Sequence, residues 1–147
     1  MNKAKAYLSE IRSLKKLADS YEEKIEVLRI KAAGIKGVAY DKDKVQVSQG
    51  HAMDDDVIAL MEAEKEYKAI LVKYHEAVLI RTKQIAMLDN PDYVQILLMR
   101  YVMEREMKLE EIAEEMYLSF DRVAHLHGEA LDAFGRKFGD MIANNSN

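Results

Sequence analysis

Apolar residues recur every seven positions along the first 32 residues of the chain. The two phases of this repeat consist of Ala4, Ile11, Ala18, Ile25 and Ala32, and of Tyr7, Leu14, Tyr21 and Leu28. An apolar a/d seam is typical of a helix that packs lengthwise against another helix. The pattern therefore predicts one long helix whose seam needs a partner, because an isolated helix would leave that stripe in water.

A second seam begins near Asp54 and offers such a partner. Its apolar positions are Val57, Leu60, Tyr67, Leu71, Tyr74, Val78, Ile85 and Leu88. Glu64 and Arg81 interrupt it, either as polar positions that set the register or as residues beyond the edge of the seam. The two helices pair with each other as an antiparallel hairpin or with another copy of the chain, and the pattern leaves both arrangements open.

The stretch between the seams, at about residues 33–53, predicts a loop because it is polar and contains three glycines. Its KVQV sequence is also compatible with a short extended piece. Three consecutive acids follow, Asp54, Asp55 and Asp56. Their carboxylates accept hydrogen bonds and carry negative charge, both of which suit the start of a helix, so we expect them to form a cap. A calcium site is the less favoured interpretation, because no glycine turn or terminal glutamate follows at the required offset.

A third helical segment begins at Asn90, which predicts an N-cap, followed by Pro91 at the first helical position. Downstream, two helices are expected on either side of a short break. The first has Leu109, Ile112, Ala113 and Met116 on one face, and the second has Val123, Leu126, Ala130, Leu131 and Phe134 pointing inward. Ser119 is placed to cap the second helix, and so short a turn implies a large angle between the two helices.

These patterns together predict an all-α protein with a long N-terminal helical hairpin or coiled coil and a C-terminal helix-turn-helix domain. The expected organisation is residues 1–89 for the long-helix pair, 90–139 for the helix-turn-helix domain and 140–147 for a disordered tail. The composition agrees with a helical, soluble chain, since 49% of its residues are hydrophobic and 33% are charged, with one proline and no tryptophan.

The C-terminal segment resembles region four of bacterial primary sigma factors, whose helix-turn-helix reads promoter DNA. The residues that carry the resemblance are LLMRYV before the motif, LEEIAEEMYLS through the first helix and turn, and DRV, Leu126 and AL in the second helix. The order of long helices followed by this module also resembles the ArpU/RinA-type transcription regulators of Gram-positive phages and prophages. That resemblance implies control of late phage genes, or of an associated chromosomal gene, through DNA binding near a promoter.

The resemblance implies that the first two turns of the second helix contact DNA. The matching positions are Ser119, Phe120, Asp121, Arg122, Ala124 and His125, and upstream Arg105 and Lys108 are expected to contact phosphates. Arg122 suits a phosphate or a guanine edge, and His125 suits a base edge. Phe120 suits a thymine methyl group, unless it is a partly buried turn residue, and Asp121 suits cytosine N4 or only the helix N-terminus.

Phe120 and Ala124 depart from the sigma pattern, because they stand where that family usually has basic residues. Residues 91–147 also carry six Lys and Arg against eleven Asp and Glu, a net charge of −5. Few cations are therefore available to neutralise phosphates. Binding is expected to need several copies of the chain, joined through the long helices, or help from RNA polymerase.

Double-stranded DNA, RNA polymerase and further copies of the chain are thus the expected partners. Two alternatives are a module that binds RNA polymerase or another regulator with little DNA contact, and a DNA-packaging adaptor similar to a small terminase subunit. No enzyme, cofactor or small-molecule substrate is expected, because the sequence has no phosphate-binding glycine loop, HExxH motif or nucleophile elbow.

No metal site is expected either. Cysteine is absent, and His125 and His127 are two positions apart, which points them about 200° away from each other on a helix. The start of the chain offers no signal peptide and no membrane span. Without disulfides, the cytoplasm is the expected location.

Overall fold

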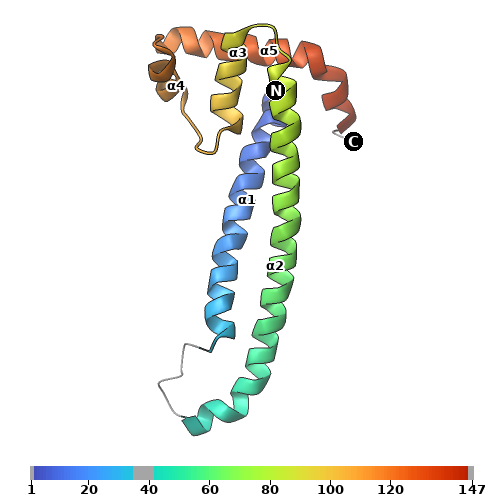
Figure 1. The fold of residues 1–147 in the computed structure, drawn as a ribbon, viewed down its shortest axis with the longest axis vertical. Helices are drawn as coiled ribbons and strands as arrows, with labels where there is room; N and C mark the ends of the chain where they lie inside the picture. The colour runs from blue at the N-terminus through green and yellow to red at the C-terminus, as the bar shows by residue number, and fades with distance from the viewer. Residues whose placement is uncertain (1, 35–41, 146–147) are drawn as a thin grey trace. The chain divides into compact units, whose positions relative to one another are not determined.

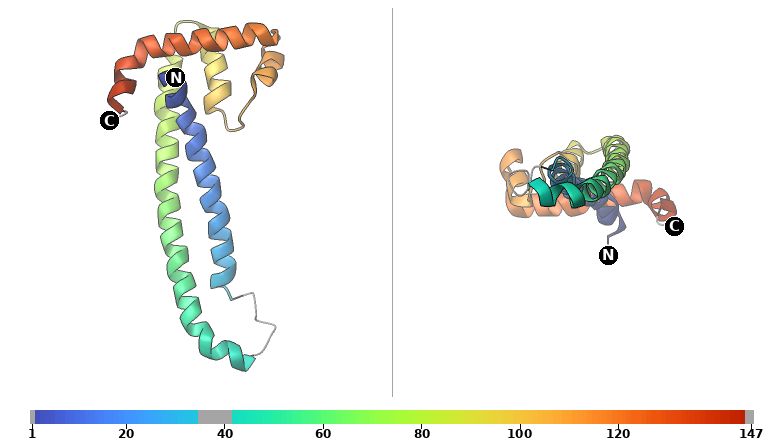
Figure 2. Two further views of the ribbon diagram at one scale, coloured as in Figure 1. Left: turned by 180° about the vertical axis from the view of Figure 1, so that it is seen from behind. Right: turned by 90° about the horizontal axis from the view of Figure 1, so that it is seen from below.

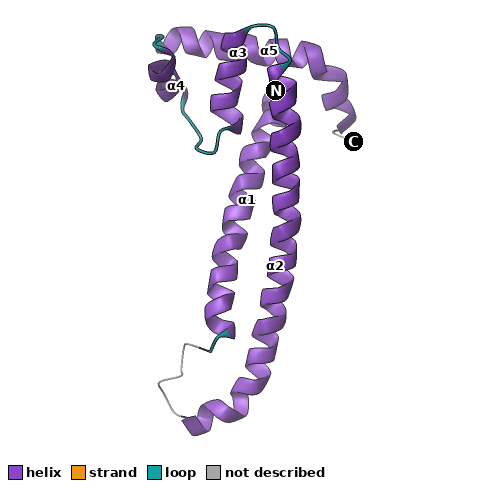
Figure 3. Ribbon diagram, viewed as in Figure 1, coloured by secondary structure: helices purple, strands orange, loops and turns teal. Residues whose placement is uncertain are grey.

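The computed structural model describes residues 2–34 and 42–145, and it describes side chains for residues 2–34 and 55–145. Every regular element in these residues is a helix, as Figure 3 shows, which confirms the all-α class. The elements, labelled in Figure 1, are α1 (Lys3–Ala32), α2 (Lys42–Ala86), α3 (Pro91–Leu97), a π-helical turn η1 (Leu98–Val102), α4 (Leu109–Met116) and α5 (Phe120–Asn145).

The chain folds as two compact units. The hairpin unit is Leu14–Lys73, and the terminal unit combines Met1–Ser13 with Tyr74–Asn147. Each long helix therefore contributes one end to the terminal unit. The sequence pattern marks a change of helix near residue 90 but does not show that the ends of the long helices share a core with the C-terminal segment.

The hairpin unit contains parts of α1 and α2 that run antiparallel to each other within one chain (Figure 2). Among its described residues, only Ala18, Ile25 and Ala63 are buried. Arg29 and Glu64 approach each other to 3.8 Å between the helices. Glu64 is therefore a rim position beside the seam.

In the terminal unit, the main core joins the ends of α1 and α2 to α3, η1 and α5. Its buried residues are Ala4, Tyr7, Leu8, Ile85, Leu88, Leu97, Tyr101, Ala130, Leu131, Phe134 and Ile142. Arg81 lies inside this seam rather than beyond it. It is 7% exposed, with its guanidinium carbon 4.1 Å from the centroid of the Tyr7 ring and Nη2 2.9 Å from Glu10. An aromatic face and a carboxylate together allow a cation to occupy an a/d seam.

Two boundary predictions were wrong. The helix α2 begins at Lys42, so residues 42–53 are helical rather than loop, and Asp54 to Asp56 lie inside the helix where they cannot cap its start. Residues 35–41 of the predicted loop lie outside the described residues. Residues 140–145 of the expected disordered tail are helical, because Ile142 is buried in the main core and carries α5 beyond residue 139. Residues 146–147 of that tail lie outside the described residues.

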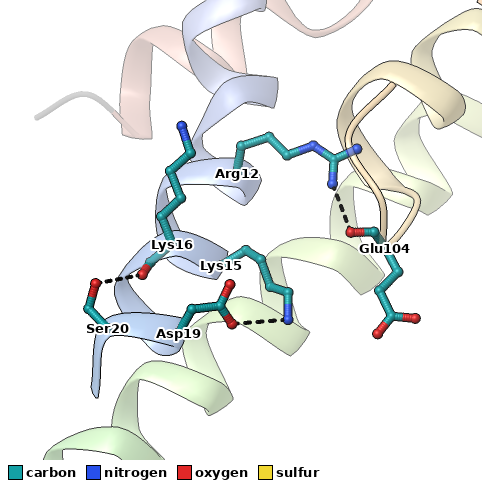
Figure 4. A network of polar contacts seen from close by, with 6 residues as sticks. All are labelled: Arg12, Lys15, Lys16, Asp19, Ser20 and Glu104. Atoms are coloured by element: carbon teal, nitrogen blue, oxygen red, sulfur yellow. Dashed lines mark hydrogen bonds and ion pairs between the residues drawn. The ribbon is translucent and has the colours of Figure 1, made fainter. Parts of the chain in front are cut away.

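Arg12 of α1 binds the end of the helix formed by α3 and η1. Its guanidinium donates to the carbonyl oxygens of Arg100 at 3.2 Å and of Met103. It also donates to the carbonyl oxygen of Glu104 at 3.5 Å, as Figure 4 shows. The last carbonyls of a helix lack partners within the helix, and a cation at that end also interacts favourably with the helix dipole. Arg12 is only 8% exposed, and its burial lowers the pKa of the guanidinium.

We expect Arg12→Met to destabilise the protein by about 1–3 kcal/mol, because it removes charge-assisted hydrogen bonds to three carbonyls and retains most of the apolar stem. Urea unfolding followed by circular dichroism measures this loss. Lys16→Met, an exposed cation four residues away, is the matched control and should change stability by less than about 0.5 kcal/mol. Equal effects of the two substitutions would contradict a capping role for Arg12.

Candidate nucleic-acid interface

The helices α3, α4 and α5 enclose a second apolar core within the terminal unit. Its buried members are Ile96, Met107, Ile112, Ala113, Val123 and Leu126. Asn90 begins this assembly as predicted, because its side chain accepts a hydrogen bond from the backbone N–H of Asp92 at 2.9 Å and Pro91 follows it. In Figures 1 and 2, α5 lies across α3 at a large angle.

Tyr117 ends α4 in the left-handed conformation, with φ of 57°. The N–H of Leu118 donates to the carbonyl of Ala113 at 3.0 Å, and the N–H of Tyr117 donates to Glu114 at 3.3 Å. The first of these is the six-residue closure of a Schellman motif. A tyrosine here is unusual, since glycine adopts this conformation without a Cβ penalty, and its side chain is 94% exposed.

Ser119 then starts α5. Its Oγ accepts a hydrogen bond from the backbone N–H of Arg122 at 3.1 Å, and its carbonyl accepts from the N–H of Val123 at 3.0 Å. These are the contacts of an N-cap residue. The predicted break between two separate helices is therefore confirmed, and α4 and α5 form a helix-turn-helix.

The first two turns of α5 bring together the residues expected to contact DNA. Asp121, Arg122 and His125 are exposed, Phe120 is 46% exposed and Ala124 is half-buried. Val123 and Leu126, on the opposite side, are in the core. The exposed side chains of these two turns therefore include a single permanent cation, Arg122, and one aromatic ring, Phe120, on different sides of the helix.

Arg105 and Lys108 lie before α4 and are also exposed. Arg105 is already engaged, since its Nη1 is 2.6 Å from Glu111, and the hydrogen bond that Arg105 donates lowers the pKa of that carboxyl. Lys108 occupies the N-cap position of α4 without making a side-chain cap. Lys108 also interacts with Glu111, because its backbone N–H and its charge both contribute to lowering the pKa of that carboxyl.

Glu129 orients His125 from one turn further along α5. One carboxylate oxygen accepts from the Tyr93 hydroxyl of α3 at 2.9 Å, and the other lies 3.1 Å from His125 Nε2. The hydrogen bond to Glu129 raises the pKa of Tyr93. A carboxylate only accepts hydrogen bonds, so this contact is attractive when Nε2 carries a proton.

His127 has a different role that the sequence did not reveal. Its Nε2 lies 2.7 Å from the Tyr101 hydroxyl, and the two rings stack with centroids 5.7 Å apart. Burial, with smaller contributions from Arg100 and Lys5, lowers the pKa of His127 to about 4, and burial raises the pKa of Tyr101 to about 12. The sequence pattern did not reveal this contact, because it requires Tyr101 of η1 to lie opposite α5. That position follows from tertiary packing.

The part of the chain that the structure describes contains no group of three His, Asp or Glu side chains placed to hold a metal ion. Within the same residues, no helix is both long enough and apolar enough to cross a membrane.

Replacing Tyr117 by glycine should stabilise the protein by about 0.5–1 kcal/mol, because it removes the cost of a side chain in the left-handed conformation. Glu114→Gly, three residues earlier on the exposed face of α4, is the control and should destabilise by about 1 kcal/mol. Thermal unfolding of both variants gives the sign. A loss of stability on Tyr117→Gly would show that the tyrosine side chain makes a compensating contact.

Protonation of His127 should destabilise the fold. In the unfolded chain this histidine binds a proton near pH 6.5, whereas in the folded chain it does so near pH 4. Stability from the neutral imidazole is therefore complete above about pH 6.5 and is lost as the pH falls toward 4. The stability difference between wild type and His127→Gln, measured by urea unfolding, should shrink over that interval; a constant difference would contradict this assignment.

No protein-family model matches the chain, and no curated protein and no solved structure matches it. The function of the helix-turn-helix is therefore inferred from its own residues and contacts.

Proposed function

We propose that this chain is a DNA-binding transcriptional regulator that acts through the helix-turn-helix of α4 and α5. The observation that carries the proposal is the exposed start of α5, where Arg122 and His125 point outward from a helix whose other face is buried. An α-helix presented in this way fits the major groove of B-DNA, whose base edges differ among all four base pairs.

Each exposed side chain has a distinct contribution in this proposal. Arg122 donates to a phosphate or to guanine O6 and N7, and Phe120 contacts a thymine methyl group. When the imidazole of His125 is neutral and its Nε2 proton is directed to Glu129, Nδ1 is an acceptor for adenine N6 or cytosine N4. Asp121 accepts from cytosine N4. Ala124, with its small side chain, allows the backbone of α5 to approach the base edges.

The cations at the start of α4 position the motif without reading sequence. Lys108 contacts phosphate directly, whereas Arg105 first has to exchange its 2.6 Å ion pair with Glu111 for a phosphate. Since the segment is acidic overall, counterion release supplies little affinity to a single copy. We therefore expect a shallow salt dependence for one copy, and productive binding when several copies or RNA polymerase contribute contacts.

The resemblance to sigma region four and to the ArpU/RinA-type regulators supplies the biological setting of the proposal. In this proposal the DNA site lies near a promoter, and the regulated targets are late genes of a phage or prophage, or an associated chromosomal gene. The cytoplasm is where such a regulator acts.

A second candidate function is a protein-interaction module that engages RNA polymerase or another regulator. The acidic surface of α4 favours it, because Glu110, Glu114 and Glu115 are exposed on one short helix. Such a surface repels the DNA backbone and suits a basic protein partner.

Duplexes selected by the purified protein from a random-sequence library provide the probe, and fluorescence anisotropy measures their affinity. Arg122→Ala should weaken binding by about 10-fold to 100-fold, corresponding to the loss of one good base or phosphate contact. Arg136→Ala, an exposed arginine further along α5, is the matched control and should bind like wild type. Failure to select any duplex, or equal affinities for the two variants, would favour the protein-interaction alternative.

A further inference from the structure

The turn between α4 and α5 exposes large apolar side chains. Tyr117 and Leu118 are 94% and 36% exposed, and Phe120 beside them is 46% exposed. Figures 1 and 2 show this turn at an outer edge of the terminal unit. We call the side chains of Tyr117 and Leu118 the turn patch. Single exposed apolar residues are common on protein surfaces, whereas adjacent ones indicate contact with another molecule.

The conformation of Tyr117 lowers the stability of the chain. Among the described residues, Tyr117 is the one non-glycine residue with a positive φ, at 57°. In the left-handed region a Cβ atom crowds the following carbonyl oxygen, and glycine avoids this cost. Because the tyrosine ring is almost fully exposed, no buried contact within the chain offsets the cost. Backbone strain that the surrounding fold does not require is typical of functional sites.

The carboxylates next to the turn patch add a second cost. Glu114 and Glu115 are exposed in the last turn of α4, and that turn contains no Lys or Arg. The carbonyl end of a helix carries partial negative charge, so carboxylates there are unfavourable. Residues 109–121 contain five Asp and Glu and no Lys or Arg. The turn patch is therefore an apolar surface in an acidic setting, and two local preferences are violated to form it.

These charges distinguish between classes of partner. The phosphates of a nucleic acid and the surface of an anionic membrane are repelled by Glu114 and Glu115. A protein surface in which lysine or arginine borders an apolar pocket is attracted by the same residues. Tyrosine is also among the side chains that contribute most to protein–protein affinity, because its rigid ring buries a large area while its hydroxyl stays at the rim.

We propose that the turn patch is a docking site for a protein partner that has an apolar pocket bordered by lysine or arginine. The Tyr117 ring enters the pocket, and Leu118 packs at its edge. Glu114 and Glu115 pair with the cations around it. The ring supplies most of the affinity, whereas the acids at the rim increase the association rate and select a basic partner.

This docking site does not depend on DNA binding by α5, so it can be measured on the protein without DNA. The conformational cost of Tyr117 also makes the test unambiguous. Tyr117→Gly removes the ring and is expected to stabilise the fold, because glycine adopts the left-handed conformation freely. A loss of partner binding in this variant is therefore not a consequence of unfolding.

Short random peptides displayed on phage and selected on the full-length protein provide the probe. Enriched peptides should combine several Lys or Arg residues with aromatic or aliphatic ones. Fluorescence anisotropy of labelled synthetic copies measures their affinity. Tyr117→Gly should raise the dissociation constant by about 10-fold or more, since it removes the anchoring ring. Leu79→Ala, which truncates a side chain of α2 that is 57% exposed, is the matched control and should bind like wild type.

Neutralising the acids tests the electrostatic part of the proposal. Glu114→Gln with Glu115→Gln should weaken peptide binding by about 3-fold to 10-fold at low salt and make it less sensitive to sodium chloride. Asp132→Asn with Asp140→Asn removes the same charge from exposed positions of α5 and is the control. Equal effects of the two pairs would overturn the assignment of Glu114 and Glu115 to the rim.

The remaining outcomes separate this site from the DNA-binding surface. Failure to enrich any peptide, enrichment of acidic peptides, or peptides that bind Tyr117→Gly as tightly as wild type would overturn the docking site. If Tyr117→Gly instead weakens only a selected DNA duplex, Tyr117 contacts DNA and the docking site is again overturned. Peptides that behave as expected, together with failure to select any duplex, would support the docking site and contradict DNA binding alone.

Discussion

The reversal of the chain between α4 and α5 determines which side chains the terminal unit exposes. Tyr117 adopts a left-handed conformation, two backbone hydrogen bonds close the end of α4, and Ser119 caps the start of α5. If this turn were straightened into one helix, the apolar faces of α4 and α5 could not both reach the core they share. Arg122 and His125 lie outward only because Val123 and Leu126 are held inward.

Buried polar groups attach the ends of the long helices to this unit. Arg12 binds the carbonyl end of η1, and Arg81 lies against the Tyr7 ring beside Glu10. Gln84 accepts from the Tyr7 hydroxyl at 2.9 Å, which adds a hydrogen bond between α1 and α2. Such contacts require a fixed geometry, so they specify how α1, α2 and η1 meet within the terminal unit more strictly than apolar packing alone.

Local signals made much of the fold predictable. The cap at Asn90, the cap at Ser119 and the inward face of α5 depend on residues close together in sequence, and all were found as predicted. Contacts between distant segments were not predictable in this way. Two examples are the contact between Tyr101 and His127 and the hydrogen bonds of Arg12. Each joins segments that are distant in sequence, and the periodicity of apolar residues does not show that these segments meet.

The boundary errors have a related cause. Glycine and clustered acids indicate loops and caps only on average, because helix propensity is a weak guide by itself. The burial of Ile142 extends α5, and α2 continues through Asp54 to Asp56. For the interface, residue types indicated which side chains are suited to DNA, but their exposure and their ion pairs with Glu111 and Glu129 required the folded chain.

The proposed surface for DNA consists of the first two turns of α5. Two-dimensional NMR of the labelled protein, titrated with a selected duplex, locates the contact surface residue by residue. We expect the largest shift changes at the backbone amides of residues 119–125 and at the Arg122 side chain, with residues 14–32 little affected. Changes confined to other parts of the chain, with residues 119–125 unperturbed, would contradict it.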